Sequence, residues 1–310
     1  MKIVALAGGV GGAKLVHGFA EVLAAEDLAI IVNTGDDFEH FGLYICPDLD
    51  TVCYTLAGLA NSDTGWGRAD ETWTTITKIV ELGGPDWFRL GDLDFATHIE
   101  RTRRMRAGQS LSQIVNSFCK TWNVTPTILP MSDDRIRTKV ETQEYGWLDF
   151  QEYFVKYKCS PKVKGFNFQH IENSPPAPGV IESIAKADAV VICPSNPWVS
   201  IAPILGVSGI RSSLIGKLVI AVSPIVAGKA IKGPAAKMYA ELGYKPSALT
   251  VAEHYSELIR GFVLDNSDES LRSAIEQLNL HVLTTNTLMT GVKNRIQLAE
   301  DVLNFIGSLI

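Results

Sequence analysis

Short runs of apolar residues that stop at small or polar residues recur along the chain and predict buried parallel strands. The first run covers residues 2–7 and ends at two glycines, and the second covers residues 28–33. Between them, apolar side chains repeat every three or four positions, which predicts an amphipathic helix over about residues 12–23. A strand, a glycine turn, a helix and a second strand in this order are typical of a right-handed βαβ unit.

The same pattern returns in the second half of the chain. Residues 189–193 and 218–222 are apolar runs followed by polar loops, so they predict two more buried strands. Other patterns predict strands at 127–130 and 135–141 around a turn at 131–134, a loop at 174–179, and helices at 181–186, 271–279 and 296–306.

Residues 51–122 have a helical pattern with aromatic residues and no clear strand, and we interpret them as a mostly helical inserted subdomain. The whole chain, residues 1–310, is predicted to be a single domain of the α/β class. Its core is predicted to be a Rossmann-like, mainly parallel sheet flanked by helices, formed by about residues 1–50 and 123–310.

Ligands of open α/β sheets bind beyond the carboxyl ends of the strands. In this sequence the predicted strands are followed by small or polar loops at residues 8–12, 33–37, 194–197 and 223–228. We therefore expect these four loops to surround one cleft.

Composition narrows the class of protein. Hydrophobic residues make up 46% and charged residues 20% of the chain, and the net charge is −6. These values are typical of a globular domain and argue against a nucleic-acid partner, which requires a basic surface. One local basic cluster, Arg101, Arg103, Arg104 and Arg106, is either a solvated helix face or a set of phosphate contacts.

Cysteine usage and hydropathy exclude other classes. The five cysteines are scattered without a CxxC pair, so neither a zinc site nor a disulfide framework is expected. The apolar start of the chain is too short for a membrane span and lacks the layout of a signal peptide. We expect a cytoplasmic protein without a membrane partner.

The turn after the first strand is rich in glycine and predicts phosphate contacts. Glycines allow backbone N–H groups to approach phosphate oxygens, and the following helix presents its positive end. The turn matches neither the P-loop nor the GxGxxG pattern, and a tight strand–helix turn without a ligand is the alternative. The candidate nucleotide-binding residues here are Gly8, Gly9, Gly11, Gly12 and Lys14.

Two other loops also have groups suited to a nucleotide. Asn33 and Thr34 end the second strand with an amide and a hydroxyl, where an NAD-dependent dehydrogenase would have an acidic residue. Ser195, Asn196 and Pro197 follow a later strand and precede a predicted helix. We predict nucleotide contacts for all five. Lys232 and Lys237 lie in a third such region and are candidates for phosphate contacts.

Asp48 and Asp50 are spaced so that both carboxylates can share Mg²⁺, a cation that prefers oxygen ligands and binds substrate phosphates. Asp36 and Asp37 add negative charge if the loops converge. The alternative for Asp50 is a helix N-cap.

The segment 88–98 combines Arg89, Thr97 and His98 with two aspartates among apolar residues, which suggests the lining of a pocket. His98 by itself is equally typical of a buried structural histidine. Trp66, Trp73 and Trp87 are candidates for stacking on a planar ligand or for the core. The sequence has no Ser/His/Asp order typical of a nucleophile, so positioning, a cation and electrostatics are left to drive a phosphoryl-type transfer.

Taken together, the loop motifs resemble those of one family. They occur in a consistent order from residue 1 to about residue 300: GGVGGAKL, NTGDD, CPDLDTV, RLGDLDFATHIER, ILPMSDD, VICPSNPWVSIAPIL, AVSPI, GPAAKM and TLM. This set is similar to that of the CofD family, the 2-phospho-L-lactate transferases of coenzyme F420 biosynthesis.

The resemblance implies a Rossmann-like fold with a helical insertion and a specific reaction. The terminal hydroxyl of the deazaflavin Fo attacks a GDP-linked phospholactate or a related acid, GMP leaves, and F420-0 or dehydro-F420-0 forms with the help of Mg²⁺. The resemblance implies that Asp50 and Arg89 contact Fo. We also predict that these two residues act in catalysis, that Thr97 and His98 lie at the Fo site, and that Asp48 and Asp50 bind the metal. A homodimer is expected.

Two questions stay open at this point. Phospholactate, phosphoenolpyruvate and phosphoglycerate all stay candidates for the transferred acid, because no motif in the sequence distinguishes between them. The alternative function is that of the CofD-like regulatory proteins, which share the glycine-rich start and bind a UDP-sugar or nucleotide without catalysis.

Overall fold

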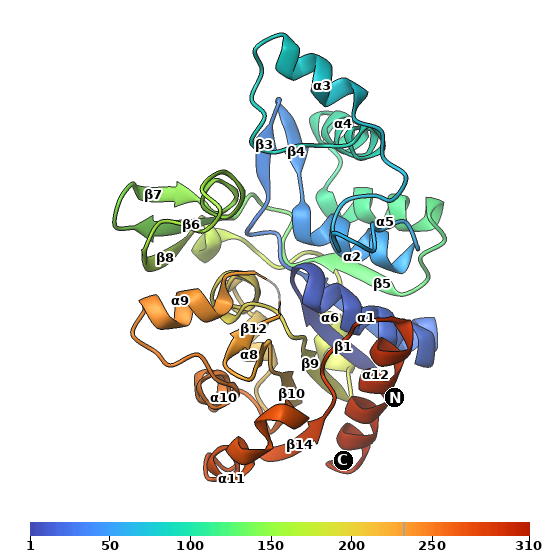
Figure 1. Cartoon of the computed structure of the whole chain (residues 1–310). Helices are drawn as coiled ribbons and strands as arrows, with labels where there is room; N and C mark the ends of the chain where they lie inside the picture. Colours follow the sequence, from blue (N-terminus) through green and yellow to red (C-terminus); the bar gives the residue numbers. More distant parts are fainter. Residues whose placement is uncertain (232) are drawn as a thin grey trace.

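The computed structural model describes residues 1–231 and 233–310, so Lys232 lies outside the described residues. Seven strands form a central sheet in the order β14-β13-β10-β9-β1-β2-β5, and every neighbouring pair is parallel. The strands are β1 (Ile3–Ala7), β2 (Leu28–Val32), β5 (Thr127–Pro130), β9 (Ala189–Ile192), β10 (Leu218–Val222), β13 (Gly261–Asp265) and β14 (His281–Thr285). The predicted fold class is confirmed (Figure 1).

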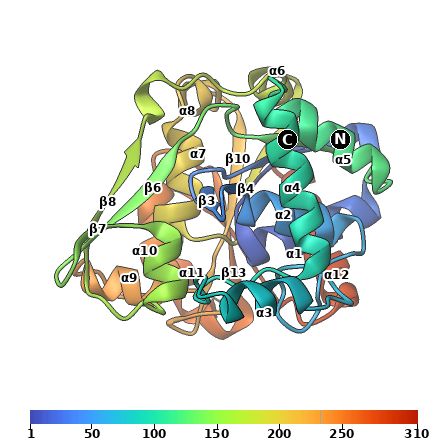
Figure 2. The same cartoon turned by 90° about the horizontal axis from the view of Figure 1, so that it is seen from above.

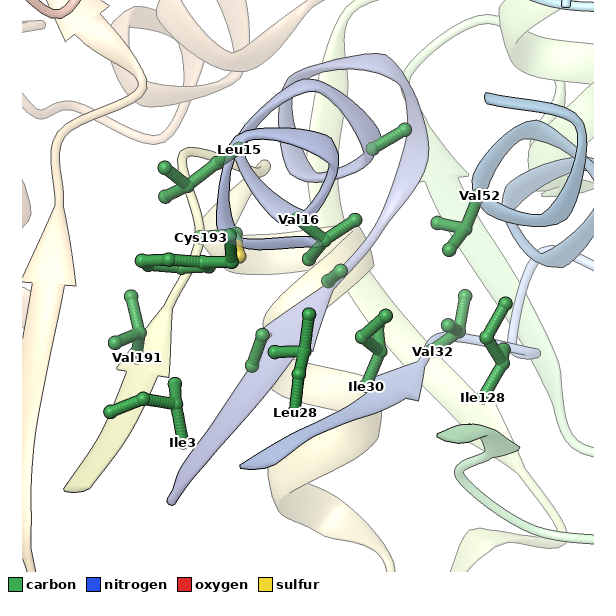
Figure 3. Packing of buried hydrophobic residues seen from close by; sticks show 14 of the residues in the cluster. Ile3, Leu15, Val16, Leu28, Ile30, Val32, Val52, Ile128, Val191 and Cys193 are labelled. Carbon is green, nitrogen blue, oxygen red and sulfur yellow. The ribbon is translucent and has the colours of Figure 1, made fainter. Parts of the chain in front are cut away.

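Side chains of the sheet alternate between two apolar cores. Ile3 and Val191 face the core shared with Leu15 and Val16 of the first helix (Figure 3), whereas Val4 faces the opposite core. This burial of both faces explains why the central strands are nearly continuous apolar runs. The first core is covered by α1 (Gly9–Val22), α2 (Pro47–Leu56), α5 (Leu111–Thr121) and α12 (Val292–Gly307). The second is covered by α6 (Val180–Lys186), α7 (Ala202–Gly206), α8 (Ile210–Ser213), α10 (Ala248–Tyr255) and α11 (Arg272–Glu276).

Two smaller parts lie above the central sheet in Figure 1, and Figure 2 shows the molecule from that side. One contains the hairpin of β3 (Phe38–His40) and β4 (Leu43–Ile45), with α3 (Thr74–Glu81) and α4 (Asp92–Arg106) beside it. The other is the antiparallel sheet β7-β6-β8, made of β6 (Arg137–Thr142), β7 (Gly146–Asp149) and β8 (Val163–Gln169), against which α9 (Ala235–Glu241) packs.

Short segments complete the chain. They are the hairpin of β11 (Ile225–Val226) and β12 (Lys229–Ala230), the 3₁₀ turns η1 (Ala25–Asp27), η3 (Ile171–Asn173) and η5 (Asn266–Leu271), and the π-helical turns η2 (Glu152–Lys156) and η4 (Pro197–Ile201). Among the described residues, no helix combines the length and apolar character needed to cross a membrane.

Several predicted elements need correction. The first helix begins at Gly9, three residues earlier than predicted, because the glycine turn is itself helical. The strand predicted at 135–141 begins at Arg137 and belongs to the small antiparallel sheet. The helix predicted at 271–279 is present as α11 but ends at Glu276, three residues earlier than predicted, and the 3₁₀ turn η5 precedes it.

The division into a core and an insertion stays a prediction. Residues 51–122 contain most of α2 and all of α3, α4 and α5, with a single isolated bridge between Ala60 and Arg68. However, α2 and α5 contribute to the first core, and the hairpin β3–β4 packs with Phe95 of α4.

Candidate active site

A cavity of about 490 Å³ lies beyond the carboxyl ends of the central strands. Its walls include Gly8–Gly11 after β1, Asp36 after β2, Pro194–Asn196 after β9, Ser223 after β10 and Thr287–Thr290 after β14. The prediction that four loops surround one cleft is therefore confirmed, and the loop after β14 is an addition that sequence analysis missed.

The glycine turn forms the floor of the cavity. Helix α1 begins at Gly9, so the N–H groups of its first turn have no partners within the helix and lie at the cavity. Glycine is required at two positions by close packing. A Cβ on Gly8 would come within 2.5 Å of Ser200 Cβ, and one on Gly11 within 2.2 Å of the Pro194 carbonyl oxygen.

Ser195 ties the loop after β9 to this turn. Its hydroxyl oxygen accepts a hydrogen bond from the Gly8 N–H at 3.1 Å and donates one to the Gly8 carbonyl at 2.7 Å. Asn196 lines the cavity and also caps η4, because its Oδ1 accepts from the Trp198 N–H at 2.9 Å. Lys14 lines the same side and donates to the Met289 carbonyl at 2.8 Å.

Two carboxylates, the buried Asp36 and the half-buried Asp48, line the cavity together with the glycine turn. Asp48 Oδ2 accepts from Asn33 Nδ2 at 3.0 Å, and burial raises the pKa of Asp48 to about 6. Burial and the neighbouring Asp48 charge raise the pKa of Asp36 well above its ordinary value, and its Oδ1 has no hydrogen-bond partner among the described residues. Raised pKa values mean that the two negative charges are unfavourable in this environment, so a proton or a bound cation stabilises the pair.

Asp50 is bound by a buried arginine. Arg101 is 1% exposed, and its Nη1 donates to Asp50 Oδ2 at 3.0 Å while Nη2 donates to Asp50 Oδ1. The N-cap alternative for Asp50 is wrong, because α2 begins at Pro47 with Cys46 as its N-cap. Neither the solvated helix face nor the phosphate contacts predicted for the basic cluster describes all of its arginines. Arg101 is buried, whereas Arg103 and Arg104 pair with Glu100.

Three further polar side chains connect to this pair. Nδ1 of His98 lies 3.1 Å from Arg101 Nη1, and its Nε2 lies 3.3 Å from Asp94 Oδ1. The Tyr54 hydroxyl donates to the same Asp94 oxygen at 2.8 Å. Although burial acts against it, His98, Tyr54 and Arg101 together lower the pKa of Asp94. Tyr54, Asp94 and His98 all line the cavity, and only His98 was predicted to.

Part of the cavity lining, which we call the acceptor wall, is aromatic and apolar. Trp66 and Leu90 line it together with Phe150 and Phe154, whose rings stack with centroids 5.5 Å apart. The Arg89 guanidinium also lines the cavity and lies 5.2 Å from the centre of the Trp73 ring. Of the three candidate tryptophans, Trp66 lines the cavity directly; Trp73 and Trp87 are outside its lining.

Five predicted site residues are not part of the cavity lining. Asn33, Thr34 and Thr97 are buried beside it, Gly12 packs against Ser195 and Ala7, and Pro197 begins η4. Asn33 instead contacts the lining residue Asp48, so it supports the site from behind. Because these five residues do not line the cavity, the structure does not place them to contact a nucleotide or Fo directly. Lys237 pairs with Glu241, and Lys232 lies outside the described residues.

The structure offers few metal ligands close together. The described residues contain no group of three or more His, Cys, Asp or Glu side chains arranged to hold a metal ion. Mg²⁺ in phosphate-binding sites, however, commonly uses one or two carboxylates and takes its other ligands from substrate phosphates and water. Asp36 and Asp48 fit that pattern better than Asp50, both of whose oxygens accept hydrogen bonds from Arg101.

Comparisons with known proteins identify relatives that match nearly the whole chain. A model of the family "2-phospho-L-lactate transferase CofD" matches residues 3–296. The chain is 43% identical over 311 residues to a phosphoenolpyruvate transferase of Kitasatospora aureofaciens, covering 98% of this chain and 97% of that protein. It is 41% identical to a protein of the same name from Streptomyces coelicolor (98% and 97% covered) and 37% identical to one from Mycobacterium sp. strain KMS (94% and 96% covered).

Solved structures with the same fold are more distant in sequence. A member of the UPF0052 family from Bacillus halodurans superposes with a TM-score of 0.65 at 15% identity, covering 97% of this chain and 98% of that one. At this identity the likeness shows the fold alone. The match of the family model over nearly the whole chain, together with relatives above 40% identity, shows that the chain belongs to the CofD family of transferases.

Proposed function

We propose that this protein transfers a phosphorylated three-carbon acid from a GDP-linked donor to the terminal hydroxyl of the deazaflavin Fo, with release of GMP. The single observation that carries the proposal is the cavity itself. It places an anion-binding glycine turn, buried carboxylates and an aromatic wall around one space. These are the three surfaces that a diphosphate, a cation and a planar alcohol require.

The donor fits the side of the cavity nearest β9, β10 and β14. The N–H groups at the start of α1 suit a diphosphate, since helix N-termini and glycine turns bind anions, and Asp48 already accepts a hydrogen bond from the Gly9 N–H. Lys14 adds positive charge on this side, and Asn196 and Thr287 offer polar groups to a nucleoside. The guanosine then lies over the C-terminal half of the sheet.

The acceptor fits the opposite wall. Trp66, Phe150 and Phe154 offer ring faces to the flat deazaflavin, and the Arg89 guanidinium adds a donor and a stacking surface. This arrangement directs the sugar-alcohol chain of Fo toward Asp50, between the aromatic wall and the glycine turn.

Asp36 and Asp48 are the residues that fit Mg²⁺, because one oxygen of Asp36 lacks a partner and burial disfavours two unneutralised carboxylates. When bound there, Mg²⁺ supplies positive charge to the donor diphosphate. This assignment replaces Asp50 by Asp36 in the metal pair predicted from the sequence and keeps Asp48.

Asp50 accepts a hydrogen bond from the Fo hydroxyl and orients its oxygen for in-line attack on the phosphorus that carries the acid. The new P–O bond forms as the P–O bond to GMP breaks, and the hydroxyl proton passes to the Asp50 carboxylate. Little proton removal is needed before bond breaking, because phosphoryl-type transition states are loose. Positioning and electrostatics therefore provide most of the catalysis.

The names of the similar proteins favour one of the three candidate acids. Phosphoenolpyruvate transferases that cover nearly the whole chain at 41–43% identity favour an enolpyruvyl donor over a lactyl or glyceryl one. Incubating the purified protein with Fo, Mg²⁺ and each of the three GDP-linked donors tests this. We expect GMP and dehydro-F420-0, detected by mass spectrometry, from the enolpyruvyl donor; release of GMP without Fo, or no product from any donor, would contradict the proposal.

A further inference from the structure

We propose that Arg101 is a positioning residue for Asp50, and that the five side chains Asp50, Tyr54, Asp94, His98 and Arg101 fix the acceptor wall of the cavity relative to the glycine turn. We call these five residues the α2–α4 seam. The inference deepens the proposed function and rests on it for its activity measurements. Its structural content can be tested separately.

The seam residues occupy one face of each helix. Asp50 and Tyr54 are four positions apart on α2, and Asp94, His98 and Arg101 follow at spacings of four and three on α4. Residues at these spacings lie on the same side of a helix. The polar contacts between them therefore connect α2 to α4 directly.

Arg101 has no access to substrate. It is 1% exposed and is not among the residues that line the cavity, whereas Asp50 is. Its two terminal nitrogens hold both oxygens of Asp50, and Nη1 also lies 3.2 Å from the Tyr44 carbonyl. Arg101 can therefore affect the reaction only through the side chains that it contacts, chiefly Asp50 through two hydrogen bonds and to a lesser extent His98, both of which line the cavity.

The chemistry of arginine fixes the state of the next residue. A guanidinium is only a donor, so Nδ1 of His98 must accept the hydrogen bond from Arg101 and the imidazole proton must be on Nε2. That nitrogen lies 3.3 Å from Asp94 Oδ1, within ion-pair distance but without hydrogen-bond geometry, and the same oxygen accepts a hydrogen bond from the Tyr54 hydroxyl. Each seam residue thus orients its neighbour, and the series starts and ends on α2.

The two helices that the seam joins carry the two sides of the cavity. Helix α2 shares the first core with α1, whose start is the glycine turn. Helix α4 directly follows Arg89 and Leu90 of the acceptor wall. A small change in the seam would move donor and acceptor relative to each other, and errors of about 1 Å in such positions cost on the order of 100-fold in rate.

A purely structural role predicts different behaviour. Buried ion pairs stabilise a fold no better than apolar residues of similar volume, so stability alone does not explain a five-residue polar seam. A positioning role predicts that changes in the seam lower turnover while the donor site still binds its ligand.

The test is a double-mutant cycle. Arg101→Lys keeps the charge but loses the two-pronged contact, so we expect kcat to fall about 100-fold while GDP, used as the donor-site probe, binds as in the wild type. In the Asp50→Asn background the same change should lower kcat less than 3-fold further, because Arg101 acts through Asp50. Arg104→Lys on the same helix, which pairs with Glu100, is the matched control and should leave kcat unchanged.

A second pair of variants covers the case in which Arg101→Lys does not fold. His98→Asn keeps an acceptor for Arg101 and should retain more turnover than His98→Ala, with similar melting temperatures. Equal loss in these two variants, or a full 100-fold effect of Arg101→Lys in the Asp50→Asn background, would overturn the positioning role.

Failure of the proposed function gives a different result, namely no turnover by the wild-type protein with any GDP-linked donor. The seam is then judged from crystal structures of the wild type and the His98→Ala variant. We expect the Asp50 carboxylate to change its orientation in the variant. An unchanged Asp50 would contradict the inference.

Discussion

The hydroxyl of Ser195 bridges both backbone groups of Gly8, accepting from its N–H at 3.1 Å and donating to its carbonyl at 2.7 Å. This contact joins loops 187 positions apart in the sequence and holds the first residue before α1 in place. The donor side of the cavity depends on it, because the N–H groups of the turn must be aimed before a diphosphate arrives.

Replacement of Ser195 by Ala should leave the buried Gly8 N–H without its partner. We expect the free energy of unfolding to fall by about 1–3 kcal/mol and the affinity for GDP to fall several-fold. Urea titration and calorimetry measure the two effects. The control is Ser256→Ala, which removes an exposed hydroxyl bonded to the Glu253 carbonyl and should change neither quantity. Unaltered GDP binding by the Ser195 variant would argue against a role for this bridge.

Gly11→Ala tests the packing of the turn. The new Cβ would lie 2.2 Å from the Pro194 carbonyl oxygen, which is backbone and cannot rotate away. We expect a loss of stability of about 2 kcal/mol or more and weaker GDP binding. Gly307→Ala is a suitable control, since nothing lies within 4 Å of its Cβ position and it ends α12. The control should be neutral or stabilising by up to about 1 kcal/mol.

Asp36→Asn and Asp48→Asn test the cation assignment. Each removes one negative charge from the pair, so we expect the Mg²⁺ concentration for half-maximal activity to rise about 10-fold or more and kcat to fall about 100-fold. Chelation of Mg²⁺ should abolish turnover of the wild type. Glu257→Gln, at a carboxylate 90% exposed on another surface, should behave as the wild type. Unchanged Mg²⁺ dependence in both Asp variants would refute the assignment.

Arg89→Ala tests the acceptor wall. The guanidinium lines the cavity and lies over Trp73, so its removal should raise KM for Fo about 10-fold without changing GDP affinity. Fo fluorescence gives the binding constant directly. Arg103→Ala, which removes an exposed arginine paired with Glu100, should leave both values unaltered. A rise in the GDP dissociation constant of the Arg89 variant would mean that donor and acceptor sides are wrongly assigned.

Acid should destabilise the fold through His254, a histidine whose pKa is lowered in the folded chain. Partial desolvation of this side chain, together with the charge of Arg211, lowers the pKa of His254 below its ordinary value of 6.5. Near and below pH 6.5 this histidine binds a proton in the unfolded chain while it stays neutral in the folded chain. It therefore lowers the free energy of unfolding as the pH falls. The buried aspartates act in the opposite sense, so the variant must be compared with wild type at each pH. We expect the His254→Gln variant to gain stability relative to wild type between about pH 7.5 and about pH 5.5 in urea titrations. A constant difference between the two proteins would contradict this.

Much of the central sheet could be predicted from the sequence. The strands that carry the site were predictable because a strand buried on both faces is an apolar run, and the loops that end them followed from the polarity of residues such as Ser195 and Asp36. Strands β13 and β14 were missed. The side chains of β14, at the sheet edge, are half-buried or exposed and include polar residues, which weakens its apolar pattern, and β13 is a run of only five residues.

The identity of contacts within the site was harder to predict. The sequence predicted that Arg101 and three other arginines form either a solvated helix face or a set of phosphate contacts, because spacing does not reveal that Arg101 points toward Asp50 from another helix. Thr97 and His98 are neighbours in the sequence, but adjacent residues of a helix face different directions, and only His98 lines the cavity. The resemblance to the family supplied Asp50 and Arg89, both of which line the cavity; their roles and the expected homodimer stay predictions.

The central claim is that one cavity brings a GDP-linked three-carbon acid against the alcohol of a deazaflavin. The most direct measurement is the mass of the product formed when the wild-type protein and its Asp50→Asn variant are mixed with Fo, Mg²⁺ and the GDP-linked enolpyruvyl donor. We predict stoichiometric GMP and dehydro-F420-0 from the wild type and at least about 100-fold slower formation by the variant. Binding of a nucleotide-sugar with no product from any GDP-linked donor would contradict the claim and favour a regulatory protein.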